Sequence, residues 1–230
     1  MIKSFLIIIN FSILLFSSQQ IILVVADDMN SSQAKLQCFE NNKKVFNTIS
    51  VNIGKNGLGW GVESENFTKN PTDASKYEGD KKAPAGIFRL SNIFGYAQKS
   101  DYNLPYLYAE KNLICIDDTY SSFYNQIIMA YGDEKSFELM RRDDDQYKLG
   151  IVIDYNKKAF KGRGSCIFMH IQRAPNSPTV GCTSMSEKDI QKIAHWLDKN
   201  KKPILIQIPK KAAKEVIKLY PQLKSSQLLH

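Results

Sequence analysis

Residues 162–170 read Gly-Arg-Gly-Ser-Cys-Ile-Phe-Met-His, and residues 180–184 read Val-Gly-Cys-Thr-Ser. From Ser165 to Ile171 successive side chains point to opposite faces, and the run is mostly apolar, which predicts a buried strand with His170 near its end. The connection between the two stretches holds two prolines, an asparagine and a serine, which cannot continue a strand and favour a turn. We therefore expect the loop to return Cys182 to the vicinity of His170.

A histidine beside a cysteine is the pair that thiol nucleophilic catalysis requires. A free thiol has a pKa of about 8.5 and only the thiolate attacks, so a neighbouring base must take the proton. This predicts Cys182 as the nucleophile and His170 as the base, with the backbone N–H groups of Gly181 and Cys182 as an oxyanion hole. Cys166 lies about 13 Å from His170 along an extended strand, which is too far for a hydrogen bond. The alternative is that Cys182 is a structural thiol or half of a disulfide, and that His170 is a core histidine.

The rest of the chain predicts a mainly β domain. Strand-like segments occur at residues 21–25, 34–39, 45–53, 83–90, 106–116, 147–155 and 204–208, and the first two are predicted to form a hairpin. Helical patterns are fewer: a short compatible stretch at 136–142, an amphipathic helix after Ser186 that leaves His195 solvated, and a basic helical tail whose last residues fray. We expect one catalytic domain over residues 20–209 and the tail over residues 210–230.

The first residues and the net charge predict an exported protein. Residues 1–19 begin with a positive charge and continue with a short apolar core, as a secretory signal does. A membrane anchor is the alternative, but polar residues 17–20 interrupt the apolar run before the roughly 20 residues that a spanning helix needs. The formal net charge is +8, and the sequence lacks the motifs of nucleic-acid-binding proteins. We expect a protein that is peripheral to the cell envelope, with no nucleic-acid partner and an oligomeric state that the sequence leaves open.

Four cysteines are present, and their spacing does not match a zinc site, so we expect no metal and no cofactor. In an oxidising compartment they could form two disulfides. If Cys182 is kept free for chemistry, at most one pair forms among Cys38, Cys115 and Cys166. Cys38 and Cys115 both lie in strand-like or apolar segments and are equally compatible with a role as small core residues.

The histidine, the loop and Thr179-Val-Gly-Cys182, preceded by Lys82-Ala-Pro-Ala-Gly-Ile-Phe88, resemble the motifs of the YkuD-type L,D-transpeptidases. This resemblance implies a mainly β (α+β) sandwich or barrel with a few peripheral helices. It also implies a cysteine acyltransferase of the bacterial periplasm or cell envelope that acts on peptidoglycan stem tetrapeptides. Cys182 would attack the carbonyl of the third residue, D-Ala would leave, and an amine would resolve the acyl-enzyme. Resolution by water, in an L,D-carboxypeptidase, is one alternative, and a non-catalytic wall-binding protein is another.

The sequence departs from the family pattern at two positions beside the motifs. The arginine that usually follows the cysteine is absent, because Thr183 and Ser184 stand there, and Ile171 replaces the glycine that usually follows the histidine. Substrate contacts are then expected from the hydroxyl side chains of Thr179, Thr183 and Ser184. We hypothesise that Arg163 or Arg173 supplies the missing positive charge, because a guanidinium binds a carboxylate through two hydrogen bonds. The alternative is that both arginines are solvated surface residues.

Overall fold

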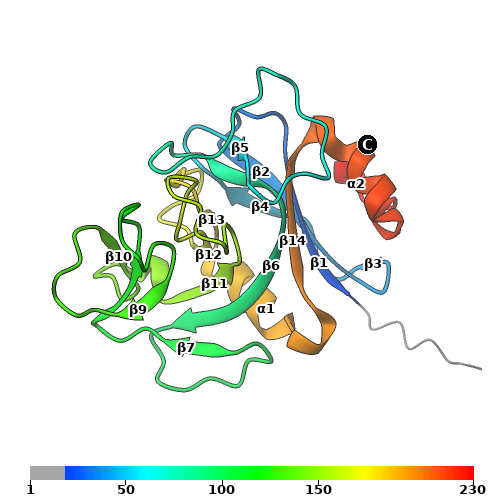
Figure 1. Ribbon diagram of the computed structural model, residues 1–230. Helices are drawn as coiled ribbons and strands as arrows, with labels where there is room; N and C mark the ends of the chain where they lie inside the picture. Colours follow the sequence, from blue (N-terminus) through cyan, green and yellow to red (C-terminus); the bar gives the residue numbers. More distant parts are fainter. Residues whose placement is uncertain (1–18) are drawn as a thin grey trace, which may run out of the picture.

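The computed structural model describes residues 19–230, and a closed β-barrel forms its centre (Figure 1). The strands follow one another around the barrel in the order β1, β14, β6, β11, β12, β13, β4 and β2, and β2 pairs again with β1. Their bounds are β1 Gln20–Ala26, β2 Gln33–Glu40, β4 Ile49–Asn52, β6 Ala83–Gly95, β11 Leu149–Ile153, β12 Phe168–Ile171, β13 Thr183–Met185 and β14 Ile204–Pro209. Closure leaves the barrel without an unpaired edge. The mainly β prediction is confirmed, whereas the predicted signal over residues 1–19 lies almost wholly outside the described residues.

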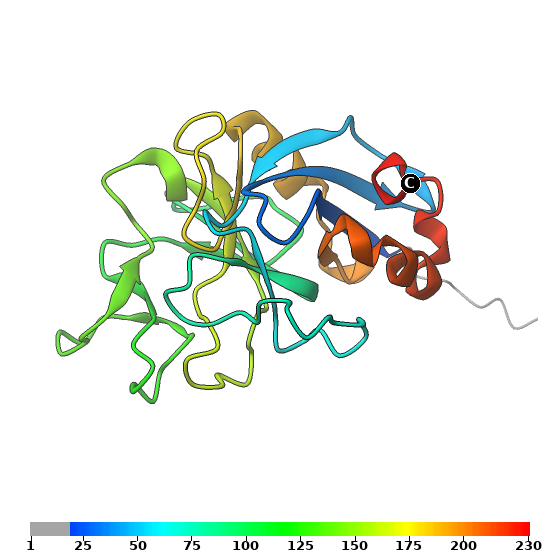
Figure 2. The same ribbon diagram turned by 90° about the horizontal axis from the view of Figure 1, so that it is seen from above.

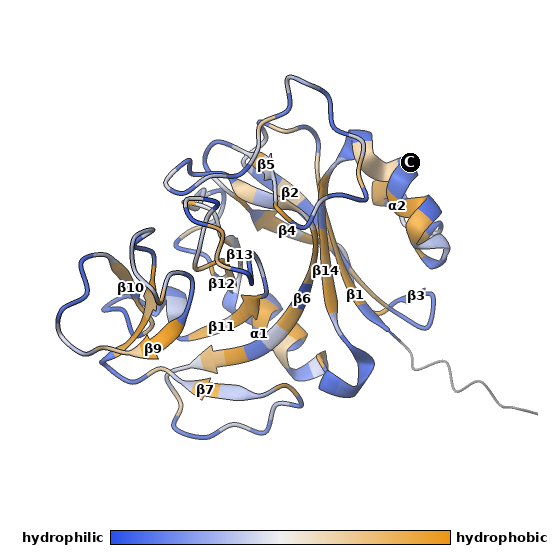
Figure 3. Ribbon diagram, viewed as in Figure 1, coloured by the Kyte–Doolittle hydropathy of each residue, from blue (hydrophilic) through white to orange (hydrophobic). Residues whose placement is uncertain are grey.

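The apolar segments of the sequence build the barrel core. Every residue of β1 is buried, and β1 pairs antiparallel with β2, which confirms the predicted hairpin. Hydropathy colouring shows that the central strands are predominantly apolar, while the outer loops are polar (Figure 3). The long strand β6 extends past the barrel and also pairs with β5, Leu58–Trp60, and β7, Tyr106–Tyr108. A two-residue strand, β3, Lys43–Lys44, pairs with β2.

A separate three-stranded sheet lies at one end of the molecule, and the C-terminal helices lie at the opposite end (Figures 1 and 2). Its strands are ordered β10, Phe137–Leu139, then β8, Leu113–Ile116, then β9, Ile127–Met129. The predicted strand over 106–116 is therefore two strands, β7 and β8, in different sheets. The helical interpretation of residues 136–142 is wrong, because the backbone of β10 pairs antiparallel with β8. Tertiary pairing of this kind overrides the weak preference of a short segment.

The helices cover the barrel from outside. Helix α1, Glu187–Trp196, begins at Ser186, whose hydroxyl accepts a hydrogen bond from the backbone of Asp189, and it buries the predicted apolar stripe while His195 is exposed. Helix α2 spans Ala213–Leu219. Short 3₁₀ helices occupy Asp145–Tyr147, Lys199–Lys201, Lys210–Ala212, Pro221–Leu223 and Gln227–Leu229. Within residues 19–230 neither α-helix has the length or the apolar character needed to cross a bilayer.

The C-terminal residues pack onto the barrel. The prediction that they fray is wrong, because Leu223 and Leu229 are buried members of the main core. The Ser226 hydroxyl, also buried, donates to the side chain of Gln37 on β2 at 2.7 Å. Burial of each leucine side chain contributes about 1.5–3 kcal/mol to the stability of the fold. This contribution exceeds the weak helix propensity of the segment, so the C-terminal residues stay packed.

Candidate active site

Two neighbouring parallel strands hold the predicted histidine and cysteine. Strand β12 runs beside β13 with His170 opposite Ser184. Cys182 directly precedes β13 and lies two residues before Ser184, so both are on the same face. The same register places Cys182 beside Phe168, two residues along β12 from His170. The strand predicted to begin at Ser165 begins only at Phe168, because Cys166 adopts a positive φ of 54° that ends the extended geometry.

Cys182 and His170 line one cavity of about 250 Å³. This catalytic cavity opens between β10, the 3₁₀ turn before β11, and the loop from Arg173 to Cys182. Its lining residues are Glu138, Arg142, Gln146, Tyr147, His170, Arg173, Ser177, Pro178, Thr179, Val180, Cys182 and Ser184. The arrangement predicted from the loop, a thiol and an imidazole facing a common space, is thus present in the fold.

The Cys182 thiol is free and almost fully buried. Its Sγ accepts a hydrogen bond from the backbone N–H of Phe168 at 3.4 Å and can donate to the carbonyl oxygen of Cys166 at 3.6 Å. Burial raises the pKa of Cys182 to about 12, the negative charge of Glu138 raises it further, and the hydrogen bond from the Phe168 N–H opposes the increase. Cys182 is therefore a neutral thiol at neutral pH, and it would become a nucleophile only after losing its proton.

His170 is a neutral imidazole in the resting protein. Burial is the main cause that lowers its pKa to about 4, and Arg142 lowers it further. Its Nδ1 lies 2.8 Å from the carbonyl oxygen of Ile171, which selects the tautomer with the proton on Nδ1. The other ring nitrogen, Nε2, then carries the lone pair that a general base uses.

The loop before Cys182 is held by its own polar groups. The Thr179 hydroxyl donates to the carbonyl oxygen of Cys182 at 2.6 Å and accepts from the N–H of Gly181 at 3.1 Å. Gly181 has a φ of +153°, a conformation that side chains with a Cβ rarely adopt. The structure therefore uses Thr179 and the Gly181 N–H to shape the turn that presents Cys182.

The other predicted contact residues are separated by the alternation of β13. Ser184 faces the catalytic cavity, and its hydroxyl accepts from the buried side chain of Asn52 at 3.4 Å. Thr183 points the other way, is fully buried, and donates to the side chain of Gln207 on β14 at 2.8 Å. Thr183 is thus part of the barrel packing and does not line the cavity.

The two candidate arginines occupy different places. Arg173 is exposed and lines the catalytic cavity, and none of the described residues forms an ion pair with it. Arg163 lies outside the cavity, with its guanidinium 4.7 Å from the centre of the Tyr77 ring. A third arginine, Arg142, also lines the cavity, but both its Nε and its Nη2 bond to the carboxylate of Asp144, which offsets its charge.

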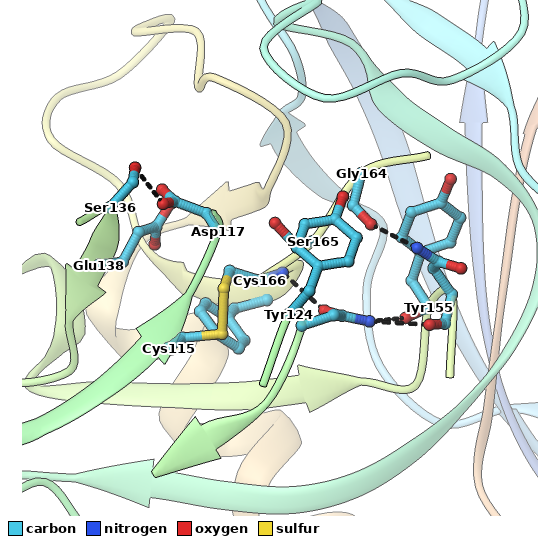
Figure 4. The surroundings of a disulfide bond; sticks show 12 residues. Cys115, Asp117, Tyr124, Ser136, Glu138, Tyr155, Gly164, Ser165 and Cys166 are labelled. Carbon is cyan, nitrogen blue, oxygen red and sulfur yellow. Dashed lines mark hydrogen bonds between the residues drawn. A yellow bond between two sulfur atoms is a disulfide. The ribbon is translucent and has the colours of Figure 1, made fainter. Parts of the chain in front are cut away.

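A disulfide between Cys115 and Cys166 joins the three-stranded sheet to the turn before β12 (Figure 4). Asn125 supports the same turn, because its Oδ1 accepts from the N–H of Cys166 at 2.9 Å while its Nδ2 donates to the carbonyl of Tyr155. Of the three cysteines that the sequence left as candidates, Cys38 remains free and buried. The bridge therefore fixes the Cys166 carbonyl that faces the Cys182 thiol.

Sequence reasoning missed two residues of the cavity, Glu138 and Tyr147. The Tyr147 hydroxyl donates to the Glu138 carboxylate at 2.6 Å, and the Tyr147 ring packs edge to face on His170 with 5.2 Å between ring centres. Glu138 lies within residues 136–142, whose sequence is compatible with a helix but which contain strand β10. The alternation of Phe137, Glu138 and Leu139 gives no signal of a carboxylate in the cavity, because it favours an outward-pointing carboxylate, whereas Phe137 and Leu139 are the exposed residues of β10.

The fold is thus a closed barrel that brings a free thiol and an imidazole into one cavity. The sequence matches the model of the L,D-transpeptidase catalytic domain family, YkuD, over residues 20–206. The chain belongs to this family, which confirms the resemblance found in the motifs. The family is one of L,D-transpeptidase enzymes that act on peptidoglycan.

The remaining comparisons add little. No sequence match was found among curated proteins. Among solved structures, a Bdellovibrio bacteriovorus protein, Bd1075, is similar with 15% sequence identity and a TM-score of 0.39. The similarity covers 90% of this chain and 56% of that one, so this chain spans little more than half of the Bdellovibrio protein.

Proposed function

We propose that this protein is an exported cysteine acyltransferase, an L,D-transpeptidase that acts on peptidoglycan stem tetrapeptides. The single observation that supports this proposal best is that the free thiol of Cys182 and the neutral imidazole of His170 line one cavity. The disulfide is consistent with export, because such bonds persist in oxidising compartments such as the periplasm. The net charge of +8 suits a protein that is peripheral to an anionic envelope.

The proposed reaction has two steps. The sulfur of Cys182 attacks the carbonyl carbon of the third residue of the stem peptide, and His170 accepts the thiol proton through Nε2 and returns it to the leaving amine of D-Ala. An amine of a second stem peptide then attacks the thioester and frees the cysteine. The N–H of Cys182 is the expected donor to the oxyanion, because the N–H of Gly181 already bonds to Thr179.

Purified muropeptides test the proposal directly. The protein is incubated with disaccharide tetrapeptides, and the products are identified by mass. A cross-linked dimer with loss of D-Ala is the expected product. Tripeptide formed by loss of D-Ala alone would replace the transpeptidase by an L,D-carboxypeptidase with the same acyl-enzyme. If tetrapeptide stays intact while the protein is folded, the proposal is contradicted and a wall-binding role is favoured.

Arg173→Ala is expected to raise KM for tetrapeptide by about tenfold with a smaller change in kcat. The reason is that Arg173 is the cavity arginine without an ion-pair partner among residues 19–230, and a charged hydrogen bond contributes about 1.5–3 kcal/mol. Arg163→Ala serves as the matched control and is expected to leave KM unchanged. Equal effects of the two substitutions on steady-state kinetics would argue against carboxylate recognition by Arg173.

A further inference from the structure

A second cavity lies on the outside of the barrel, next to the catalytic cavity. Its volume is about 540 Å³, more than twice that of the catalytic cavity and within the range of small-molecule sites. It opens between β4, the loop after β12 and the first turns of α1. We call it the polar cavity, because amide and hydroxyl side chains make up eight of its fourteen lining residues, among them Asn47, Ser50, Asn52, Gln172, Asn176 and Ser186.

The polar cavity continues the catalytic cavity along the same two strands. His170 on β12 lines the catalytic cavity, and Gln172, two residues further along the chain, lines the polar cavity. Ser184 on β13 and Ser186 are divided between the two cavities in the same way. Because β12 and β13 are parallel neighbours, the cavities follow one another in the chain direction of both strands (Figure 1). A substrate that reaches Cys182 can therefore extend from one cavity into the other.

Asn52 on β4 lies at the boundary between the two cavities. It lines the polar cavity, and its amide nitrogen donates to the side chain of Gln172 at 3.1 Å and to the hydroxyl of Ser184 at 3.4 Å. Asn52 is almost fully buried, yet its Oδ1 accepts no hydrogen bond from residues 19–230. Leaving a buried acceptor unpaired is costly, so this oxygen is available to a donor on a bound ligand.

The lining groups favour a neutral ligand that carries hydroxyl and amide groups. Amide and hydroxyl side chains both donate and accept hydrogen bonds, as the hydroxyl and acetamido groups of amino sugars do. The charges in the cavity nearly offset one another, because Lys188 and Lys192 stand against Asp189. The Nζ of Lys192 also lies 4.6 Å from the centre of the Phe46 ring, where a cation is stabilised by the protein itself. An N-acetylated saccharide matches this set of groups better than an anion does.

We propose that the polar cavity binds the N-acetylated disaccharide that carries the stem peptide. This inference rests on the proposed function, and it names the part of the substrate that lies beyond the catalytic cavity. Cys182 and Ser186 are four residues apart, or about 13 Å along an extended chain. The three residues between the attacked carbonyl and the sugar span about 10 Å when extended. The stem peptide can therefore place its sugar in the polar cavity while its third residue is at Cys182.

Turnover kinetics measure the contribution of the sugar. In the wild-type protein, KM for the tetrapeptide with its disaccharide is expected to be about tenfold lower than KM for the same tetrapeptide without it. Ser50→Trp fills the polar cavity, because Ser50 is an exposed residue of β4 that lines it, and should bring this ratio close to one. Lys35→Ala is the matched control. Lys35 donates to the Ser50 hydroxyl at 2.9 Å without lining the cavity, so its loss breaks the same hydrogen bond and should keep the ratio.

Binding of a disaccharide to the full chain tests the site without any turnover. The probe is N,N′-diacetylchitobiose, a neutral disaccharide of N-acetylated amino sugars, titrated into protein labelled with ¹⁵N. Saturable shifts of the backbone amides around Ser50 and Gln172 are expected, with a Kd of about 1 mM or below. Ser50→Trp should weaken binding at least tenfold and Asn47→Ala about threefold, whereas Lys35→Ala should leave Kd unchanged.

Three results would overturn the inference: a wild-type protein whose amide signals do not move, shifts that persist unchanged in Ser50→Trp, or the same shifts produced by inorganic phosphate, which would make the cavity an anion site. The wild-type titration needs no variant, so a variant that does not fold leaves the test intact. A protein that binds the disaccharide but leaves tetrapeptides unprocessed would keep this site and lose the transpeptidase assignment. A protein that processes tetrapeptides but binds no disaccharide would lose the saccharide site alone.

Discussion

Cys182→Ser is expected to abolish both covalent capture of a carbapenem β-lactam and turnover of tetrapeptide, with a loss on the order of a millionfold in kcat. The buried thiol is the free sulfur that faces the catalytic cavity, and a serine hydroxyl in its place is a far weaker nucleophile. Intact mass of the protein after incubation with the β-lactam measures capture, and muropeptide analysis measures turnover.

The chain offers a matched control in its other free cysteine. Cys38 is also fully buried, but it lies on β2 in the barrel core, and burial raises its pKa far above the ordinary value. Cys38→Ala is expected to keep the adduct and the turnover, at some cost in stability from the lost side-chain volume. An adduct that survives in Cys182→Ser, or that disappears in Cys38→Ala, would contradict the assignment of Cys182 as nucleophile.

The double variant Cys115→Ser/Cys166→Ser is expected to lose about 4 kcal/mol of unfolding free energy, because the bridge closes a loop with a sequence separation of 51 residues. We also expect alkylation of Cys182 to slow by about tenfold at neutral pH. The bridge fixes the turn before β12, and the Phe168 N–H at the start of β12 donates to the Cys182 sulfur and stabilises its thiolate. Urea unfolding monitored by circular dichroism measures the first effect, and peptide mapping after iodoacetamide measures the second.

Tyr124→Phe is the control that separates two roles of the disulfide, stabilising the fold and maintaining the reactivity of Cys182. Tyr124 belongs to the same region, where it and Ser165 both donate to Glu78, so its loss weakens the anchoring without breaking the bridge. If the double variant is destabilised but alkylates at the wild-type rate, the bridge stabilises the fold only. The same conclusion would follow if a reductant opened the Cys115–Cys166 bond of the wild-type protein and Cys182 still alkylated at the rate of the oxidised protein.

Local patterns in the sequence predict those parts of the fold that depend on neighbours along the chain. The β1–β2 hairpin follows from two apolar runs joined by turn-forming residues, and α1 follows from its capping serine and apolar stripe. Patterns failed where a short segment takes its structure from a distant partner. Strand β10 exists because β8 presents a backbone edge to it, and nothing within residues 136–142 records that edge.

The candidate site divides in the same way. The sequence predicts that His170 and Cys182 share one space, because the prolines and the asparagine between them end the strand and favour a turn back toward it. It also determined the family, through the same motifs. Glu138, Tyr147 and Arg173 join that space, and Cys115 pairs with Cys166, only in the folded protein. These groups come from segments far apart in the chain, and closure of the barrel and docking of the small sheet bring them together.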